Sequence, residues 1–226
     1  MKLVLIKYNA GNIQSVLNAL DRLGVQAVVS NNIEEIRSAD KVIFPGVGHA
    51  KTAMQSLQAA KLDVVIKNLK QPVLGICVGM QLLCAHSEEE DTTGLGIIPI
   101  AVKRFRSSGS PREGLGERSG PLNGDSALKL KVPQVGWNTI YNLRSDLFKN
   151  VKENSYIYNV HSYFAEDSKH TIATCSYGVE YAAAIKKDNF YGLQFHTEKS
   201  AGTGDAILKN FLHLSGTWKS WKCVPE

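Results

Sequence analysis

The first half of the chain alternates short apolar runs with amphipathic stretches, and this alternation restricts the possible folds more than any other feature. Four apolar runs predict buried strands, at 2–8, 26–30, 41–46 and 71–76. Four amphipathic stretches predict helices, at 12–24, 33–39, 50–70 and 79–89. Because strands that alternate with helices form parallel sheets covered on both faces, we expect an α/β fold with a mainly parallel central sheet.

The second half of the chain has a different pattern. Its strand-like runs follow one another with few helices between them, at 128–142, 155–165, 171–178 and 180–196. Such runs suit an antiparallel or mixed extension of the sheet. A last amphipathic helix is predicted at 203–216. The sequence shows no internal repeat, so we expect one domain over 1–215 and a tail over 216–226.

Much of the surplus of basic over acidic residues lies in and beside one Gly-, Ser- and Pro-rich segment, at about 106–128. The chain carries a formal charge of +5, and the segment from Lys103 to Lys131 holds a large share of that surplus. We expect a solvated surface loop, with the steering of anionic ligands or contact with a partner as the lesser alternatives. Phe105 is its one aromatic residue, so a stacking platform for nucleic acid is not expected.

Targeting signals are not evident in the sequence. No apolar run approaches the roughly 18 residues that a membrane span needs, and the N-terminal apolar stretch is too short for a signal peptide. We therefore expect a cytoplasmic protein without a membrane partner. Reduced thiols are expected at all four cysteines, Cys77, Cys84, Cys175 and Cys223, since their spacing does not suggest a disulfide framework.

Cys77 lies where a predicted strand meets a predicted helix, between Gly75 and Gly79. This arrangement is typical of a nucleophile elbow, in which nearly side-chain-free neighbours leave room for a strained turn that presents the central side chain. A following helix would also stabilise a thiolate. The alternative is a buried cysteine between two closely packed glycines.

Cys84 follows Cys77 by seven residues, which is about 10 Å along a helix. That separation exceeds the limit of roughly 7 Å between the Cα atoms of a disulfide, and it also disfavours a shared metal site. We therefore expect Cys84 to face the core and His86 to lie on the helix surface or at its cap. No metal site and no cofactor are predicted.

A cysteine nucleophile needs a base, and the base needs a group that orients it. His196 ends an apolar run, and Glu198 lies two residues further on. In an extended segment the two side chains project to one side, so Glu198 is predicted to orient the imidazole toward Cys77. The alternative is an ordinary surface pair.

These residues together resemble the class I, triad-type glutamine amidotransferases, and in particular the glutaminase subunits of imidazole glycerol phosphate synthase. The resemblance extends over nearly the whole chain except the basic segment and the tail. Its motifs occur in this order: YNAGN, PGVG, GICVGMQLL, HSEE, GLGIIP, KVPQVGWN, NVHSYF, YGLQFH, EKS and ILKNFL. It implies a flavodoxin-like fold with a central, mostly parallel or mixed sheet flanked by helices.

The resemblance also implies roles for individual residues. Cys77 would attack L-glutamine, His196 would act as general base and acid, and Glu198 would orient His196. The oxyanion hole would consist of backbone N–H groups at Val78 and around Val47 and Gly48. Substrate contacts are implied at Gln81 and along the backbone of His161, Ser162 and Tyr163, although His161 is equally well explained as a hydrogen-bonded strand histidine.

The resemblance further implies a heterodimer with a (βα)8-barrel cyclase subunit that receives the ammonia and makes imidazole glycerol phosphate and aminoimidazole carboxamide ribotide. The implied interface residues are Asn12, Trp137, Asn138, Tyr158 and Lys199. Two alternatives stay open. One is a paralogous glutaminase that feeds another synthase, for example in nucleotide-sugar amination. The other is a noncatalytic scaffold subunit, which would be expected to lack a triad member, and none is missing here.

Three positions depart from the family pattern. Thr197 stands where proline is usual between the two triad residues, so a slightly looser triad is expected. Gln134 and Val135 stand where histidine and methionine are commoner, which concerns activation and the fit of the partner.

Overall fold

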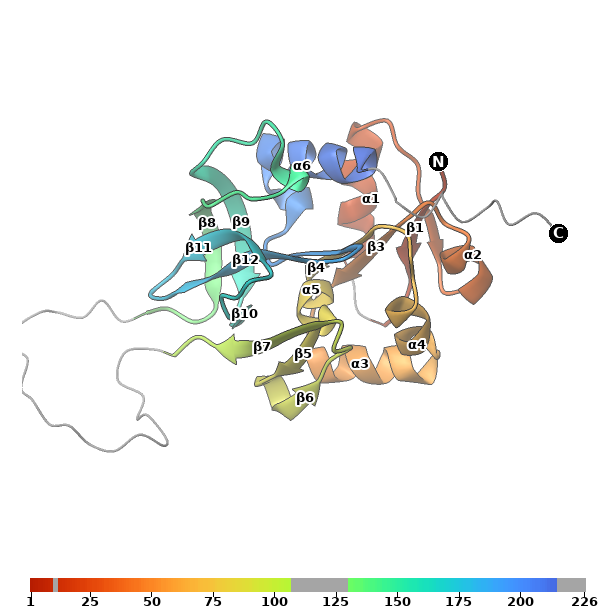
Figure 1. The fold of residues 1–226 in the computed structure, drawn as a ribbon, viewed down its shortest axis with the longest axis horizontal. Helices are drawn as coiled ribbons and strands as arrows, with labels where there is room; N and C mark the ends of the chain where they lie inside the picture. Colours follow the sequence, from red (N-terminus) through yellow and green to blue (C-terminus); the bar gives the residue numbers. More distant parts are fainter. Residues whose placement is uncertain (10–11, 107–129, 215–226) are drawn as a thin grey trace, which may run out of the picture.

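The computed structural model describes residues 1–9, 12–106 and 130–214. Of the predicted basic loop, all but Arg106 lies outside the described residues, as does the predicted tail over 216–226. Figure 1 shows a central sheet with helices on both faces and a second, small sheet at one end.

Eleven strands of the described residues form one sheet. Its parallel part has the order β2 (Val28–Ser30), β1 (Leu3–Ile6), β3 (Lys41–Gly46), β4 (Val73–Cys77) and β13 (Phe190–Leu193). Its mixed part continues from β13 with β12 (Glu180–Lys187), β10 (Tyr163–Ala165), β7 (Ile98–Arg104), β5 (Cys84–Ser87) and β6 (Thr92–Thr93), and β11 (Thr171–Ser176) pairs with β12. The expected sheet, mostly parallel in the first half and mixed in the second, is confirmed.

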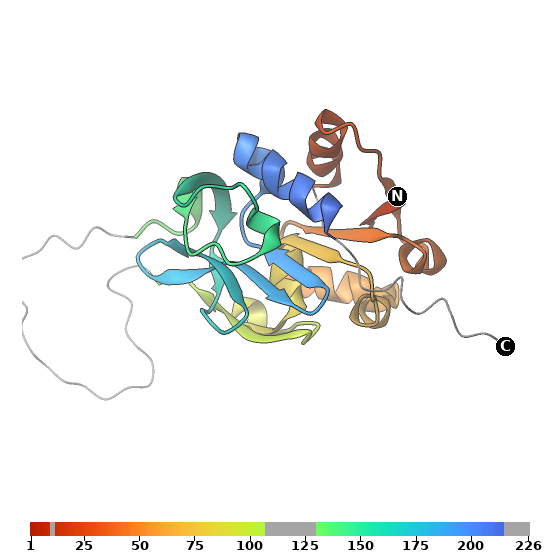
Figure 2. The same ribbon diagram turned by 45° about the horizontal axis from the view of Figure 1, so that its top comes forward.

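Helices cover both faces of this sheet (Figures 1 and 2). One face carries α1 (Ile13–Arg22) and α6 (Ala201–His213). The other face carries α3 (Ala50–Ala59), α4 (Leu62–Lys67) and α5 (Val78–Leu83). The short α2 (Ile33–Arg37) lies near β1 and β2. No helix of the described residues is long and apolar enough to cross a membrane.

The small sheet consists of β8 (Gln134–Ile140) and β9 (Ser155–His161). The two strands are antiparallel, and their register pairs Gln134 with His161 and Trp137 with Tyr158. An isolated bridge from Tyr141 to Thr174 joins the end of β8 to β11. One face of the small sheet therefore turns toward the main sheet, and the other is left at the surface.

The two predicted helices at 50–70 and 79–89 need correction. The first is two helices, because Lys61 adopts a left-handed φ of 56° between α3 and α4. The second ends at Leu83, and Cys84 begins strand β5. The helix ends there because later segments bind its last residues and the strand that follows. Leu95 N–H donates to the carbonyl of Leu82, and β5 pairs in parallel with β7. Long-range strand pairing outweighs the local helical pattern here.

Cys84 is nevertheless buried, as expected, although it lies in a strand and the helical spacing used to predict this does not apply. Burial raises the pKa of its thiol to about 12, so the group stays protonated. His86 lies in β5 with its Nε2 3.4 Å from Asp91 Oδ1, so its predicted place on a helix is wrong. Cys77, Cys84 and Cys175 are free thiols, as expected.

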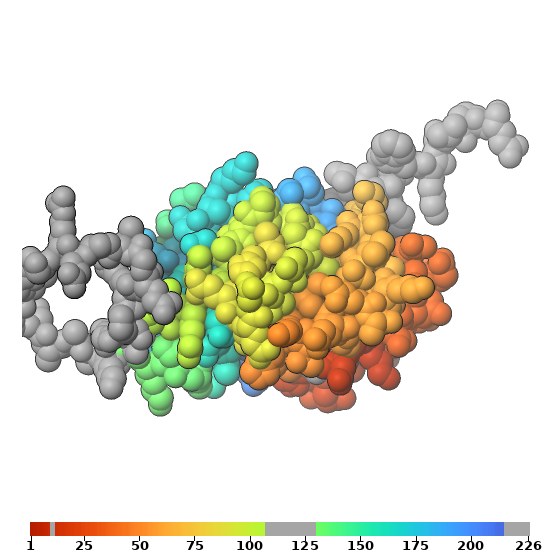
Figure 3. Space-filling view, turned by 90° about the horizontal axis from the view of Figure 1, so that it is seen from below, coloured from red at the N-terminus to blue at the C-terminus, as the bar shows by residue number. Residues whose placement is uncertain are grey.

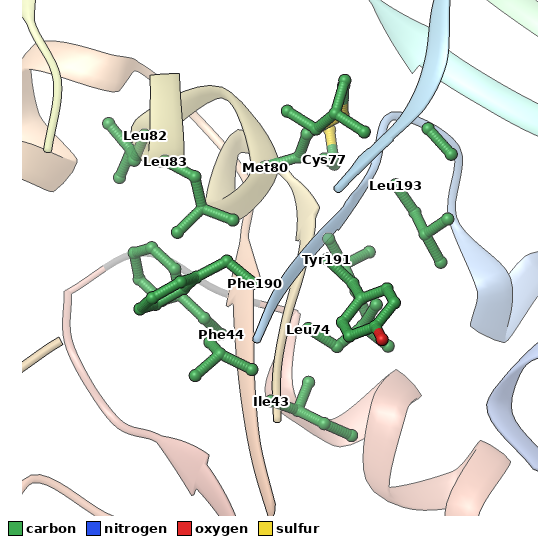
Figure 4. Close-up of a cluster of buried hydrophobic side chains, with 14 of the residues drawn as sticks. Ile43, Phe44, Leu74, Cys77, Met80, Leu82, Leu83, Phe190, Tyr191 and Leu193 are labelled. Atoms are coloured by element: carbon green, nitrogen blue, oxygen red, sulfur yellow. The ribbon is translucent and has the colours of Figure 1, made fainter. Parts of the chain in front are cut away.

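The core lies on both sides of the parallel strands. Figure 4 shows part of it, with Ile43 and Phe44 of β3, Leu74 of β4 and Tyr191 of β13 gathered around the strands that lead to Cys77. Figure 3 shows the molecule from below, with the outer surface of α3 and of the β5–β7 region toward the viewer. Because β3, β4 and β13 are adjacent and parallel, their carboxyl ends meet at one edge of the sheet, where ligands of such folds bind.

Candidate active site

Cys77 occupies a sharp turn between β4 and α5. Its φ of 53° and ψ of −112° are unusual for a residue with a side chain, and backbone strain of this kind accumulates at functional sites. A Cβ atom on Gly75 would come within 2.8 Å of the Gly79 carbonyl oxygen, and one on Gly79 within 2.0 Å of the Phe44 carbonyl oxygen. The two glycines are therefore required by close backbone approach, which is the packing that a nucleophile elbow needs.

His196 and Glu198 are in direct contact. Nδ1 of His196 lies 2.7 Å from Oε1 of Glu198, and both side chains are almost fully buried. The intervening Thr197 begins a 3-10 turn, η3 (Thr197–Lys199), so the predicted extended spacing is wrong although the contact exists. The expected loosening by Thr197 is not seen in this distance. The turn is held by Ser200, whose hydroxyl donates to the carbonyl of His196.

The protonation of His196 depends on its two neighbours. Burial by itself would lower the pKa of the imidazole, but the neighbouring Cys77 and the hydrogen-bonded Glu198 outweigh this effect and raise the pKa to about 10. An imidazolium is therefore the favoured state of His196 at neutral pH. The arrangement has the order of a Cys-His-Glu triad.

A pocket of about 390 Å³ opens beside Cys77. It brings together eleven of the residues singled out in the sequence: Asn12, Val47, Gly48, Cys77, Val78, Gln81, His161, Ser162, Tyr163, His196 and Lys199. Glu198 lies behind His196 and does not line it, and neither do Trp137, Asn138 and Tyr158. Segments far apart in the sequence therefore converge on one sulfur atom.

The turn after β3 carries two of the predicted oxyanion-hole residues. Gly48 has a φ of 88°, a conformation that favours glycine, and with Val47 it lines the same pocket as Cys77 and Val78. The start of this turn is fixed by Tyr8, whose hydroxyl donates to the Pro45 carbonyl at 2.7 Å. Two segments far apart in the sequence, the turn after β3 and the start of α5, therefore line the pocket that contains Cys77.

Several pocket residues were not predicted from the sequence. They are His49, Glu89, Pro133 and Val160. Glu89 is the one acidic side chain among the described residues that line the pocket. Its Oε2 accepts a hydrogen bond from Ala50 N at 2.7 Å, and its Oε1 lies 3.3 Å from His49 Nδ1. Only the local motif HSEE pointed to this region, and the first turn of α3, which comes from a distant segment, gives the carboxylate its position.

Gln81 and Gln194 form a buried chain of side-chain amides. Nε2 of Gln81 donates to the carbonyl of Tyr163 at 3.0 Å and to Oε1 of Gln194 at 3.1 Å. Nε2 of Gln194 then lies 3.9 Å from Cys77 Sγ. Gln194 was not singled out in the sequence, where it reads as one residue of an apolar strand end.

His161 is a buried residue of the pocket lining. Burial lowers the pKa of its imidazole to about 4; a hydrogen bond to the Tyr163 carbonyl opposes this shift, and the charge of His196 adds to it. Nδ1 donates to that carbonyl at 2.8 Å, and Nε2 lies 3.4 Å from the hydroxyl of Tyr181. The Tyr181 hydroxyl also donates to Oε1 of Gln134 at 3.1 Å. His161 is therefore a neutral group that holds the backbone of the 161–163 segment.

The outer face of the small sheet presents apolar side chains beside the pocket. Trp137 and Tyr158 pack edge to face with ring centroids 5.6 Å apart, and Lys199 Nζ lies 5.9 Å from the centre of the Tyr158 ring. Val135, Tyr156 and Val160 are also exposed. We call these five residues of β8 and β9 the outer apolar face: Val135, Trp137, Tyr156, Tyr158 and Val160.

The other two predicted interface residues lie elsewhere. Asn138 alternates with Trp137 along β8, and its Nδ2 donates to the Ser176 carbonyl at 2.9 Å, on the side away from the outer apolar face. Asn12 precedes α1 at the pocket rim, where its Oδ1 accepts from the Ser15 hydroxyl. The described residues contain no cluster of His, Cys, Asp and Glu side chains with the geometry of a metal site.

Comparison with known proteins adds to this geometry. The model of the family "Glutamine amidotransferase class-I" matches residues 4–214. The chain is 50% identical to imidazole glycerol phosphate synthase subunit HisH of Bacteroides fragilis over 95% of this chain and 100% of that protein. It is 48% identical to the subunit of the same name from Bacteroides thetaiotaomicron, with the same coverage.

Solved structures share the fold at low sequence identity. A putative GMP synthase protein from Thermoplasma acidophilum has a TM-score of 0.68 and 17% identity, covering 97% of this chain and 96% of that one. The structure of PurLQS from Thermotoga maritima has a TM-score of 0.61 and 16% identity, covering 93% and 97%. These similarities concern the fold alone.

Proposed function

Because the chain belongs to the class I glutamine amidotransferases, and within them to the family of imidazole glycerol phosphate synthase subunit HisH, we propose that Cys77, His196 and Glu198 are the catalytic residues of its glutaminase reaction in histidine biosynthesis. The observation that carries this proposal is the convergence of Cys77 and His196 on one pocket, with Glu198 at 2.7 Å behind His196. Residues 1–215 form the glutamine amidotransferase domain in this proposal.

The reaction begins with attack by the Cys77 thiolate on the side-chain carboxamide of L-glutamine. A C–S bond forms, and the carbonyl π electrons move to the oxygen. When the resulting oxyanion collapses, the C–N bond breaks, and the nitrogen leaves as ammonia with a proton from His196. Water then attacks the thioester while His196 takes its proton, and glutamate and the thiolate are released.

The oxyanion is stabilised by backbone N–H groups of Val78 and of the turn at Val47 and Gly48. Each such donor is worth on the order of 3 kcal/mol when it is aimed at the developing charge. Support comes from the position of all three residues in the lining of the pocket that contains Cys77. Gly48 permits more than one backbone orientation at this turn, which suits a site that is activated on demand.

Glutamine is held by side chains and backbone around the sulfur. Gln81 uses both N–H groups within the protein, so its Oε1 is left to accept a hydrogen bond from the substrate. Ser162 and Tyr163, with the backbone at His161, line the side of the pocket that faces Gln81. Glu89, the acidic group of the described lining, receives the α-ammonium group of glutamine.

The ammonia passes to a (βα)8-barrel cyclase subunit that binds as the partner of a heterodimer. This partner is supported by the outer apolar face beside the pocket and by Lys199 and Asn12 at its rim. Exposed aromatic residues of this kind are typical anchors of protein interfaces. The cytoplasm is the compartment that the proposal implies, since a thiol nucleophile stays reduced there.

The proposal is tested by measuring glutamate release from glutamine with the purified chain, alone and with the histidine-pathway cyclase subunit. We expect release that the cyclase subunit stimulates. If glutamate is released and this subunit does not stimulate it, the partner assignment fails, and a paralogous synthase such as one for nucleotide-sugar amination becomes the better partner. If no release occurs under either condition, the catalytic assignment fails.

A further inference from the structure

The buried amide chain at Cys77 has a fixed polarity. A backbone carbonyl only accepts hydrogen bonds, so the Tyr163 carbonyl requires an N–H group from Gln81, at 3.0 Å. The second N–H of the same Gln81 nitrogen then points to Gln194, at 3.1 Å, which requires the oxygen of Gln194 on that side. The Gln194 nitrogen is left facing Cys77. The orientation of both amides therefore follows from one backbone group, without reference to the sulfur.

The position of Gln194 follows from the sheet. The parallel register of β13 and β4 pairs Leu193 with Ile76, so Gln194 comes at the level of Cys77 on the neighbouring strand. Gly192, two residues earlier, faces Met80 of α5, and the alternation of a strand directs the Gln194 side chain to the same face. Gln194 is completely buried, and its own N–H donates to the Ala183 carbonyl at 2.9 Å.

We propose that Gln194 is a catalytic residue that donates an N–H hydrogen bond from Nε2 to the Cys77 thiolate, a role that rests on the proposed function of Cys77 as nucleophile. The 3.9 Å separation of Nε2 and Sγ is long, as hydrogen bonds to sulfur are and as catalytic contacts often are before substrate binds. A donor facing the sulfur favours the anion, because a thiolate is a far better acceptor than a thiol.

A packing role alone does not explain this arrangement. An apolar side chain of similar size would fill the same volume at the strand end without burying two polar groups. The amide contributes an acceptor for Gln81 and a donor for Cys77, and both are used. Gln194 therefore joins the pocket floor at Tyr163 to the nucleophile through a single chain of hydrogen bonds.

The test compares the pH dependence of Cys77 alkylation by iodoacetamide, followed by mass spectrometry of the Cys77 peptide, in the wild type and in Gln194→Leu and Gln194→Glu. Loss of the donor in Gln194→Leu is expected to move the alkylation midpoint to higher pH and to leave the high-pH rate unchanged. Gln194→Glu retains the acceptor for Gln81 and places a carboxylate against the sulfur, so its midpoint moves further. Turnover of glutamine falls by about 10- to 100-fold in Gln194→Leu, as for a hydrogen bond to a charged group.

Gln71→Leu is the matched control. Gln71 is also buried, but its Nε2 donates to the Ile36 carbonyl, remote from the pocket, so its alkylation midpoint stays at the wild-type value. Equal midpoints in the wild type and both folded Gln194 variants would overturn the proposal. If Gln194→Leu does not fold, the alkylation midpoint of the isosteric Gln194→Glu is compared with the wild type, and equal values overturn the proposal. Because alkylation needs no partner and no glutamine, a failure of the proposed function, seen as absent turnover in the wild type, is distinguishable from this result.

Discussion

Glu198 holds His196 from within a 3-10 turn, with Oε1 at 2.7 Å from Nδ1, and its other oxygen has no hydrogen-bond partner among the described residues. The turn brings the Glu198 carboxylate to Nδ1 of His196. The other ring nitrogen of His196, Nε2, is then free to serve Cys77. A buried carboxylate with one committed oxygen is a strong orienting group, because the imidazolium compensates its charge.

Replacing Glu198 with Gln tests this orienting role. An amide removes the charge that stabilises the imidazolium and presents either an oxygen or an N–H to Nδ1, so we expect turnover to fall on the order of 10³- to 10⁴-fold, as for the orienting carboxylate of other triads. Steady-state kinetics of glutamate release measure it, with little change expected in KM. Thr197→Val is the control: its buried hydroxyl has no partner in the described structure, and removing it should leave kcat unchanged.

Replacing Cys77 with Ala should abolish glutamate release and leave binding of the cyclase subunit intact. The reason is that the sulfur forms the covalent bond, whereas the outer apolar face is unchanged. Cys84→Ala is the matched control: this thiol is buried in β5, and its loss should retain turnover at a cost of about 1 kcal/mol in unfolding free energy from the small cavity. Retained turnover in Cys77→Ala would refute the nucleophile assignment.

The role of Glu89 is tested by Glu89→Gln. The amide oxygen can still accept from Ala50 N and keep the start of α3, but the charge opposite the α-ammonium group is lost. We expect KM for glutamine to rise by about tenfold, with kcat changed little, because this interaction is the same in the bound substrate and the transition state. An unchanged KM with an unchanged thermal midpoint would contradict the substrate role.

Replacing Trp137 with Ala should weaken binding of the cyclase subunit by about 2 kcal/mol, or roughly 30-fold in Kd, as expected for a central aromatic anchor. Isothermal titration calorimetry measures the affinity. Val64→Ala is the control, because Val64 is exposed to a similar degree but lies on α4, away from the outer apolar face. Equal effects of both changes would place the interface elsewhere.

Acid should destabilise the fold through His161. Its pKa is about 4 in the folded chain, below the ordinary value of 6.5, so the unfolded chain binds the proton first as the pH falls. The free energy of unfolding therefore has its full value, as far as His161 is concerned, above pH 6.5. It falls by about 3 kcal/mol as the pH drops from 6.5 to 4. His196 adds no slope in this window, because it is protonated in both states. His161→Asn retains a donor for the Tyr163 carbonyl but has no group that titrates. Its free energy of unfolding, measured with urea at several pH values, should not show this fall.

Local sequence was sufficient to predict the elbow and most of the parallel strands. The glycines around Cys77 reflect a steric requirement that acts within a few residues, and apolar runs reflect burial on both faces of a parallel sheet. The helix at 79–89 was wrongly extended because its second half pairs with β7, a partner that no local pattern reveals. Gln194 and Glu89 were missed for the same reason, since their contacts come from distant segments.

The sequence by itself determined which residue types are present for the chemistry: a cysteine between two glycines, and a histidine followed at the second position by a glutamate. Only the tertiary structure decided how they meet. The register of β4 against β13 brings Gln194 to the level of Cys77, and a 3-10 turn, not an extended segment, brings Glu198 to His196. The physical reason is that strand register and turn geometry are set by pairing and burial across the whole sheet, which short-range patterns do not contain.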